Sequence, residues 1–441
     1  MAALASPGVV PLDVLPPHLD TPGPGDGPPG QNARWRAVVV AISIACVSLP
    51  LLRPSGPGNT GLVDLALLCA ILASVHWAST QAHSLRVPYA VPTALTMAAG
   101  AFAVLWVGAP THAVGTSGLA LVQDAFVFGW AAAIATVGQQ TRLLDVVIKA
   151  FAYGTVGWAA VLILGELTHQ TWITGINSRD GLRASLTFGD PNLAADYFVC
   201  GLLVLRAAQR PRRRGPRLLC CTLIIVATVL TLSNGGILAM LLATLLGGLF
   251  SLAKRRGVVT AATVGLVVAV GAVAVTQTVD IRGWVNRVEQ SNTLVRDSLG
   301  REAESTGSRS ALAQEGTALL LREDLAFGYG PANTESMLRS TGAAYVKEAH
   351  DDYLATLLER GVVGGLALIL LIVGVAVRAR RAARAGDLDP ELRAIVPRPE
   401  LLAAACVAIA FSAAFYEVLH FRHVWAVFGI VAALAQRGSR R

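Results

Sequence analysis

The chain has 441 residues, of which 54% are hydrophobic and only 15% are charged, and its mean hydropathy is +0.57. Apolar runs of about 18 or more residues recur along it, which excludes an ordinary soluble domain and predicts a polytopic membrane protein. The net charge of +8 could suggest a nucleic-acid ligand, but the arginines gather in short segments between the apolar runs, where they orient membrane helices. No nucleic-acid partner is expected.

Residues 1–34 are rich in proline and glycine and show no apolar periodicity. Such a segment cannot bury enough surface to fold, so we expect a disordered cytoplasmic tail. An all-α fold of about twelve membrane helices should follow. The expected spans cover residues 35–52, 61–80, 89–108, 117–138, 145–165, 191–209, 217–235, 236–253, 257–276, 353–377, 399–419 and 423–436.

One apolar stretch, residues 217–253, is too long for a single crossing of the bilayer. It contains Ser233-Asn234-Gly235-Gly236, whose residue types favour turns. We therefore divide it there into two spans.

The basic residues predict the orientation of the chain. Most of the 36 lysines and arginines lie on one side of the membrane if both termini are cytoplasmic. This topology gives membrane helices in residues 35–276 and 353–436, a cytoplasmic tail at 437–441, and one long extracytoplasmic loop at 277–352. Within the loop, residues 310–321 have a helical pattern and Gly328-Tyr329-Gly330-Pro331 predicts a turn. We expect a partly helical cap over the outer face.

The junction between this loop and the next span carries His350, Asp351 and Asp352. Imidazole can accept a proton from a sugar hydroxyl near neutral pH, and an adjacent carboxylate could orient it. A solvated loop histidine is the alternative. A metal pair is also conceivable, but no third ligand lies at a motif spacing. We therefore expect neither a metal nor a cofactor, and we interpret the six cysteines as small hydrophobic residues.

Two loop arginines are candidates for binding phosphate. Arg183 precedes Asp190-Pro191-Asn192, a turn that should cap the next helix with its amides facing outward. Arg309 follows the turn Thr306-Gly307-Ser308 and could bind a diphosphate through two hydrogen bonds. The alternatives are an ordinary helix cap beside an arginine that reaches to the membrane surface, and a solvated arginine.

Further ionisable residues lie where spans meet the outer surface. Glu417 is near the end of one span, and Arg422 or Arg360 could be its partner. Such groups are costly in a membrane and mark functional sites, although a structural salt bridge between helices is the alternative. Asp64, Asp124 and Asp196 also lie in the outer parts of spans. They could line the same cavity.

Taken together, several segments resemble the superfamily of O-antigen ligases and polymerases. The similar parts are Arg183 through Asn192, Ser233-Asn234-Gly235, Gly307-Ser308-Arg309, Gly328-Tyr329-Gly330 and His350 through Gly364. The resemblance implies a metal-independent glycosyltransferase of the bacterial inner membrane, which moves an oligosaccharide from undecaprenyl diphosphate to an acceptor hydroxyl on a glycan or lipid-linked glycan. In that family an outer-loop histidine, matching His350, activates the acceptor, and Arg309 matches an arginine that holds the diphosphate.

The chain departs from the family pattern at one position. The family commonly has Ser-Arg-Gly where this chain has Ser233-Asn234-Gly235. Arg183, Arg360 or Arg422 could supply the missing guanidinium, with Asn192, Asn234 and Glu417 as further binding residues. A non-catalytic member of the family is therefore one alternative. A secondary transporter or a flippase for lipid-linked glycans is another, because acidic residues within spans also mark ion pathways.

Overall fold

The computed structural model describes residues 29–52, 60–81, 83–106, 114–176, 183–278, 311, 314–321, 326–340, 342 and 351–438. All regular secondary structure in these ranges is helical, as the sequence predicted. The helices are α1 (Pro29–Val47), α2 (Leu62–Thr80), α3 (Ala90–Trp106), α4 (Val114–Val137), α5 (Thr141–Leu167), α6 (Thr171–Thr174), α7 (Pro191–Ala208), α8 (Arg214–Leu230), α9 (Asn234–Arg256), α10 (Val258–Thr278), α14 (Thr334–Ser340), α15 (Asp352–Leu388), α16 (Pro390–Ile395), α17 (Glu400–Ser412) and α18 (Arg422–Gly438).

Each of the predicted spans overlaps one of these helices. Among the residues that the structure describes, five helices, α2, α4, α5, α9 and α15, are long and apolar enough to cross a membrane, and shorter apolar helices lie at Ala90–Trp106, Val258–Ala274 and Glu400–Ser412. The chain is therefore a multi-pass membrane protein by length and composition, while the total of about twelve spans stays a prediction. The predicted division at Ser233 is confirmed, because α8 ends at Leu230 and Ser233 Oγ caps α9 by accepting from the amide of Gly236.

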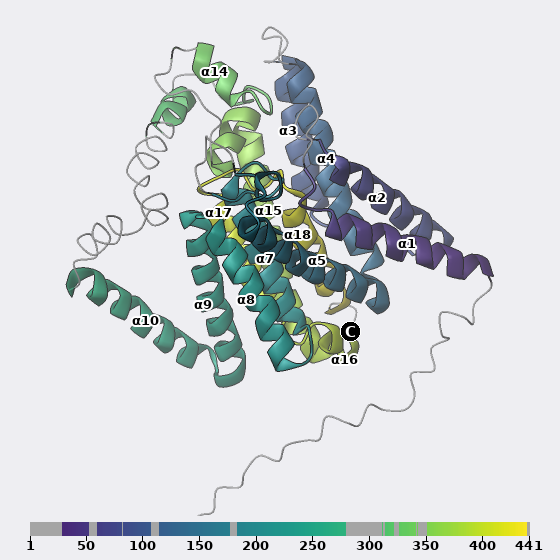
Figure 1. Cartoon of the computed structure of the whole chain (residues 1–441). Helices are drawn as coiled ribbons and strands as arrows, with labels where there is room; N and C mark the ends of the chain where they lie inside the picture. Colours follow the sequence, from purple (N-terminus) through teal and green to yellow (C-terminus); the bar gives the residue numbers. More distant parts are fainter. Residues whose placement is uncertain are drawn as a thin grey trace, which may run out of the picture.

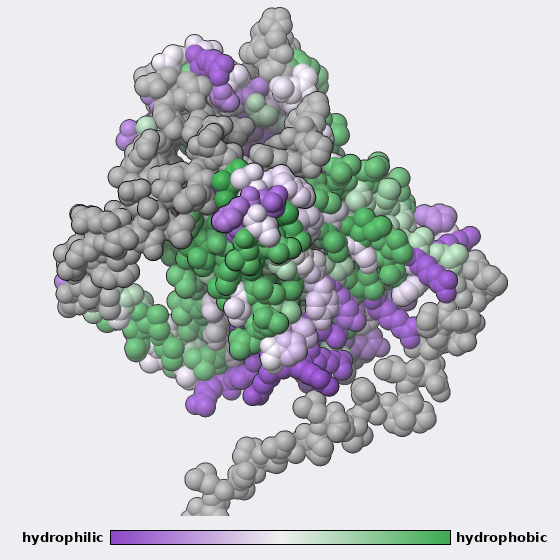
Figure 2. Space-filling view, viewed as in Figure 1, coloured by the Kyte–Doolittle hydropathy of each residue, from purple (hydrophilic) through white to green (hydrophobic). Residues whose placement is uncertain are grey.

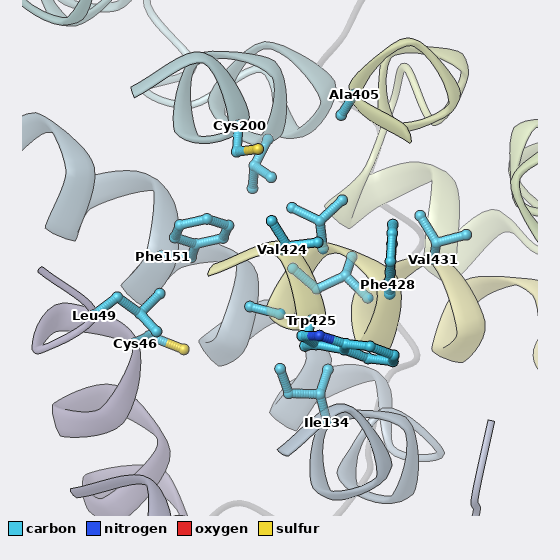
Figure 3. Close-up of a cluster of buried hydrophobic side chains, with 14 of the residues drawn as sticks. Cys46, Leu49, Ile134, Phe151, Cys200, Ala405, Val424, Trp425, Phe428 and Val431 are labelled. Atoms are coloured by element: carbon cyan, nitrogen blue, oxygen red, sulfur yellow. The ribbon is translucent and has the colours of Figure 1, made fainter. Parts of the chain in front are cut away.

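The core is built around α18. Residues 421–435 are all buried, and α18 packs against α4, α15 and α17. Figure 3 shows Trp425 and Phe428 of α18 among buried side chains that include Ile134 from α4 and Phe151 from α5. A helix buried on all sides must be apolar all round. The charged residues at its start, Arg422 and His423, therefore need partners.

The outer surface of the bundle is apolar over a broad belt (Figure 2). A hydrophilic band surrounds the end of the bundle that holds α16 and the C-terminal end of α9 (Figures 1 and 2). We call this end of the bundle the basic end. The opposite end, where α7, α9, α15 and α18 begin, is called the site end. An apolar belt between two polar ends is the surface that a bilayer requires.

Helix α15 is broken near the site end. Gly361 has φ 61° and ψ −160°, so the helix stops and restarts there. The carbonyls of Leu358 and Glu359 accept hydrogen bonds from the amides of Tyr329 and Gly330, both at 2.9 Å. The loop segment that follows residue 325 thus replaces the helical partners lost at the break. The sequence did not predict this break, because the same glycines are compatible with a continuous span.

The described part of the long loop has a small core of its own. Leu319, Tyr329 and Leu338 pack against Leu358 of α15. Residues 311 and 314–321 are helical, within the helical pattern of 310–321. This small core joins the described part of the loop to α15 at the site end.

Candidate functional site

The connection between α17 and α18, residues 413–421, lies at the centre of the site end. The prediction of a span reaching 419 is wrong here, because α17 ends at Ser412. The buried Asp352 carboxylate accepts the amides of Val418 (2.8 Å) and Leu419 (3.1 Å) through one oxygen, and the Asp352 amide donates to Ala413 O (2.9 Å). This long-range acceptor replaces the partners that a continuing helix would supply.

Asp351 has a local role in the structure. Its Oδ1 accepts from the amides of Tyr353 (2.8 Å) and Leu354 (3.3 Å), so it caps the start of α15. Burial raises the pKa of the Asp351 carboxyl above its ordinary value, although the two amides oppose this shift. Asp351 and Asp352 therefore fix the first turn of the helix that follows His350.

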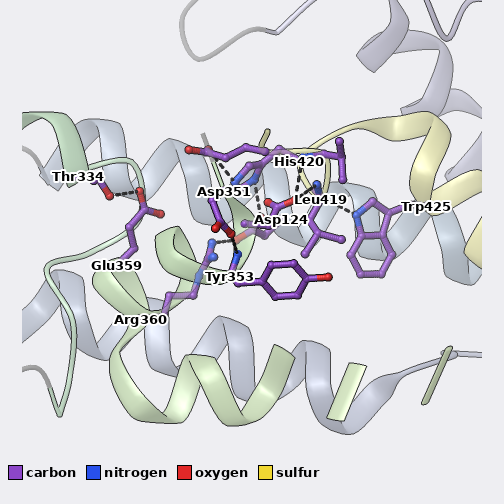
Figure 4. Close-up of polar contacts among 12 residues, drawn as sticks. Asp124, Thr334, Asp351, Tyr353, Glu359, Arg360, Leu419, His420 and Trp425 are labelled. Atoms are coloured by element: carbon purple, nitrogen blue, oxygen red, sulfur yellow. Dashed lines mark hydrogen bonds and ion pairs between the residues drawn. The ribbon is translucent and has the colours of Figure 1, made fainter. Parts of the chain in front are cut away.

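The break at Gly361 directs two charged side chains inward. Arg360 is hydrogen-bonded and ion-paired to Asp124 of α4, and each side chain is only 6% exposed. Glu359 is also buried and accepts from Thr334 Oγ1 at 3.0 Å. Figure 4 shows these side chains converging from α4, α14 and α15. A buried arginine needs this compensation, because an unpaired charge there would be several kcal/mol less stable.

His420 joins the same cluster from the α17–α18 connection. Its Nδ1 lies 3.5 Å from Asp124 Oδ1, and its Nε2 lies 3.8 Å from Glu417 Oε2. Burial lowers the pKa of His420, but the hydrogen bond and charge of Asp124, with the charges of Glu417 and Asp352, outweigh it and raise the pKa to about 9. The imidazole is therefore protonated at neutral pH.

This polar cluster consists of Asp124, Asp352, Glu359, Arg360, Glu417 and His420. Four of these six side chains are acidic, so we call this group the acidic cluster. A cavity of about 30 Å³ lies among its members, which is enough space for one water molecule. Such a cluster can accept hydrogen bonds from sugar hydroxyls. It suits a diphosphate less well, because Arg360 and His420 are already paired with acidic side chains of the cluster.

A second polar cluster lies where α7 and α9 begin. Arg183 Nη2 donates to Asn192 Oδ1 (2.9 Å), and Ser233 Oγ donates to the same oxygen (2.7 Å). Arg183 Nε also donates to Thr231 O at 3.4 Å. The N-termini of α7 and α9 are thus held together beneath a half-buried guanidinium, with Asn234 as the first residue of α9. Helix N-termini and an arginine together favour an anion.

Tyr416 links the two clusters. A Cβ atom added to Gly235 would lie 3.0 Å from the Tyr416 ring, so the connection between α17 and α18 touches the start of α9. Two residues later, Val418 is bound to Asp352. Residues 416–418 therefore connect the acidic cluster with the start of α9, where the second cluster of Arg183, Asn192 and Ser233 lies.

Two more polar pairs fix the start of α18. Arg422 binds the Asp64 carboxylate of α2 through two hydrogen bonds, of 3.0 and 2.9 Å. His423 Nε2 lies 2.9 Å from Asp196 Oδ2 of α7, and Cys200 Sγ is 3.9 Å from the same oxygen. Among the described residues, these last three side chains form the group whose ligand atoms lie close enough together, within 4.8 Å, to hold a metal ion.

The structure brings many of the sequence-predicted site residues to one end of the bundle. Arg183 and Asn192 are in direct contact, and Asn234 follows Ser233 of the same cluster. Asp352, Glu417 and Arg360 belong to the acidic cluster. His350 and Arg309 lie outside the described residues.

Sequence reasoning did not single out His420 or Glu359, and it gave Asp124 and Asp64 no partners. Asp124 pairs with Arg360 across 236 positions and Asp64 with Arg422 across 358. Their positions near span ends were visible, but the pairing was not. His420 lies three residues after Glu417, and that spacing was the one local sign of its role.

A known protein family matches the middle of the chain. Residues 219–369 match the family model described as O-antigen ligase, and no curated protein matches the chain. The matched segment runs from α8 through the long loop into α15, and so includes the Ser233 turn, Glu359 and Arg360. This match supports the O-antigen ligase superfamily as the family of this chain, as its sequence motifs indicated.

Proposed function

We propose that the chain is a membrane glycosyltransferase that moves an oligosaccharide from a polyprenyl diphosphate to an acceptor hydroxyl at the outer face of the bacterial cytoplasmic membrane. The observation that carries the proposal is the neighbourhood of two unlike clusters at the site end. One offers helix N-termini and Arg183, which suit a diphosphate. The other offers carboxylates, which suit sugar hydroxyls.

In the proposed reaction, the acceptor oxygen forms a new bond to the anomeric carbon of the donor sugar as the bond from that carbon to the diphosphate oxygen breaks. His350 takes the proton of the acceptor hydroxyl, and we assign Asp351, adjacent in sequence, to orienting the imidazole. The leaving polyprenyl diphosphate gains negative charge, which Arg183 and Arg309 stabilise together with the N-termini of α7 and α9. Arginines can supply this stabilisation without a metal ion.

Arg360 and Arg422 have a different part in this proposal. The charge of each is already compensated by a carboxylate, Asp124 for Arg360 and Asp64 for Arg422. We therefore assign them to positioning: Arg360 holds the broken end of α15 against α4, and Arg422 holds the start of α18 against α2. Ligase and polymerase chemistry share all of these residues, so the nature of the acceptor is left open.

The proposal is tested in cells of the host. A deletion strain is complemented with wild-type protein, with His350→Ala, or with His76→Ala, which alters an exposed histidine of α2 as a control. Surface polysaccharide and polyprenyl-diphosphate-linked sugars are then quantified by mass spectrometry at matched protein levels. We expect His350→Ala to reproduce the deletion, with accumulated donor and lost polymer, and His76→Ala to behave as wild type. If the deletion changes neither pool, the transferase proposal is wrong and a transporter becomes the better hypothesis.

A further inference from the structure

A groove of about 790 Å³ runs between α9, α10, α15 and α17. Tyr353 and Leu419 line it at the site end, and Leu371 and Val375 belong to its apolar wall. At the basic end its lining changes to Lys254, Arg380 and Arg384. An apolar groove with charges at one end has the polarity of a lipid molecule.

The three basic side chains line the same end of the groove. Arg380 and Arg384 are one turn apart on the same side of α15. Lys254, in the last turn of α9, donates to Ala383 O at 3.4 Å, which brings its ammonium group beside the two arginines. Among the side chains that the structure describes, which exclude those of residues 385–388, no carboxylate forms an ion pair with Arg380 or Arg384.

The acid of this groove is Glu400 of α17. Its Oε1 accepts from Ser251 Oγ at 2.9 Å. Its Oε2 is buried and has no hydrogen-bond partner among the described residues. The lining of the groove at its basic end thus has three basic side chains and one acidic side chain. One carboxylate oxygen of that acid has no hydrogen-bond donor among the described residues.

The neighbouring surface has the same sign. The pKa of Arg398 is lowered, first by burial and then by repulsion from Arg255, Arg206 and Arg217, while Glu400 opposes the shift. Arginines that repel one another in this way create a local potential that an anion relieves. The excess positive charge therefore extends beyond the groove itself.

We propose that the basic end of this groove binds phosphatidylglycerol. Its phosphate lies between Lys254, Arg380 and Arg384, one acyl chain follows the apolar wall, and a glycerol hydroxyl donates to Glu400. Basic pockets between membrane helices bind anionic lipid head groups in this way. The polyprenyl chain of a sugar donor is the other candidate occupant, but it carries no charge that would use the three basic residues at the end remote from the donor site.

The test uses the full-length protein, purified in a neutral detergent, with phosphatidylglycerol and phosphatidylcholine titrated separately and binding followed by native mass spectrometry. The variant Arg380→Gln/Arg384→Gln removes two charges from the groove. Arg212→Gln/Arg213→Gln removes two charges from exposed residues between α7 and α8, outside the groove, and serves as the matched control. Size-exclusion chromatography and circular dichroism establish that each variant is folded.

We expect wild-type protein to bind phosphatidylglycerol in preference to phosphatidylcholine, and the groove variant to bind it about 30-fold more weakly. The affinity of the control variant for phosphatidylglycerol should stay within about threefold of wild type, a change well below the one expected when two charges are lost from the binding site. Arg380→Lys/Arg384→Lys keeps both charges and should retain most of the affinity, which separates charge from folding. Equal affinity for both lipids, an equal loss in the control, or co-purified polyprenyl lipid that phosphatidylglycerol cannot displace would overturn the proposal. No sugar donor enters the assay, so its failure leaves the transferase proposal untouched.

Discussion

Substitution of Asp352 should destabilise the connection between α17 and α18 in proportion to the hydrogen bonds that are lost. One oxygen of this 2% exposed residue accepts both the Val418 and Leu419 amides. Hydrogen bonds to a charged group are worth about 1.5–3 kcal/mol each and neutral ones about 0.5–1.5 kcal/mol. Asp352→Ala should therefore cost at least about 1–3 kcal/mol, the value for two neutral hydrogen bonds, whereas Asp352→Asn, whose amide oxygen can take the same place, should cost clearly less.

Hydrogen exchange of residues 413–421, followed by mass spectrometry, together with thermal unfolding in detergent, measures both effects. The matched control is Asp389→Asn, because Asp389 also accepts two backbone amides, those of Glu391 and Leu392, but at the basic end. Exchange in 413–421 should rise from wild type to Asn to Ala and stay unchanged in the control. If Asp352→Asn is as damaging to folding as Asp352→Ala, the charge itself and not its hydrogen-bonding geometry is what the fold requires, and this reasoning fails.

Three further predictions concern the same region. Arg360→Met should destabilise the protein by about 3–5 kcal/mol, because it leaves the buried Asp124 with only the more distant His420 as a charged partner, and Asp124→Leu/Arg360→Met should cost less than Arg360→Met alone; additive losses in denaturant unfolding would contradict this. The folded-state pKa of His420 is about 9, above its ordinary value of about 6.5, so its stabilising charge should be complete below about pH 6.5 and lost as the pH rises through 9. The difference in unfolding free energy between wild type and His420→Asn should shrink over that interval by at most about 3 kcal/mol, because the side chain is 32% exposed and solvent screens its charge. A difference that does not change with pH would refute the raised pKa of His420. Gly361→Ala would place a Cβ 2.4 Å from Ala326 O at a positive φ, so it should cost at least about 3 kcal/mol; wild-type expression and unfolding temperature would show that the break in α15 is not required.

Local patterns in the sequence predicted much of the fold. Apolar run length located the helices, and the turn residues at Ser233 located the boundary between α8 and α9, because a cap forms from residues that are close in sequence. Asp190 caps α7 for the same reason, with its Oδ1 accepting from the Asn192 amide. These features need no knowledge of the rest of the chain.

Features that depend on distant partners were missed. The apolar residues 413–419 looked like the end of a span, but their amides are satisfied by Asp352 and the helix stops early. Likewise, α15 can be interrupted at Gly361 because the loop amides of Tyr329 and Gly330 donate hydrogen bonds to two carbonyls of α15 that precede the break. The arginines of the site were predicted as ligands for phosphate, yet Arg360 has a long-range carboxylate partner that no local pattern reveals.

Transfer by the purified protein is the most direct test of the central claim. Wild-type protein in lipid nanodiscs is mixed with a membrane extract of the deletion strain, which supplies donor and acceptor, and both free polyprenyl diphosphate and glycosylated acceptor are quantified over time. The account predicts equal molar formation of the two products, unchanged by a metal chelator and at least about 100-fold slower with His350→Ala. Donor that stays intact with active, folded wild-type protein, or an unchanged rate with His350→Ala, would contradict it.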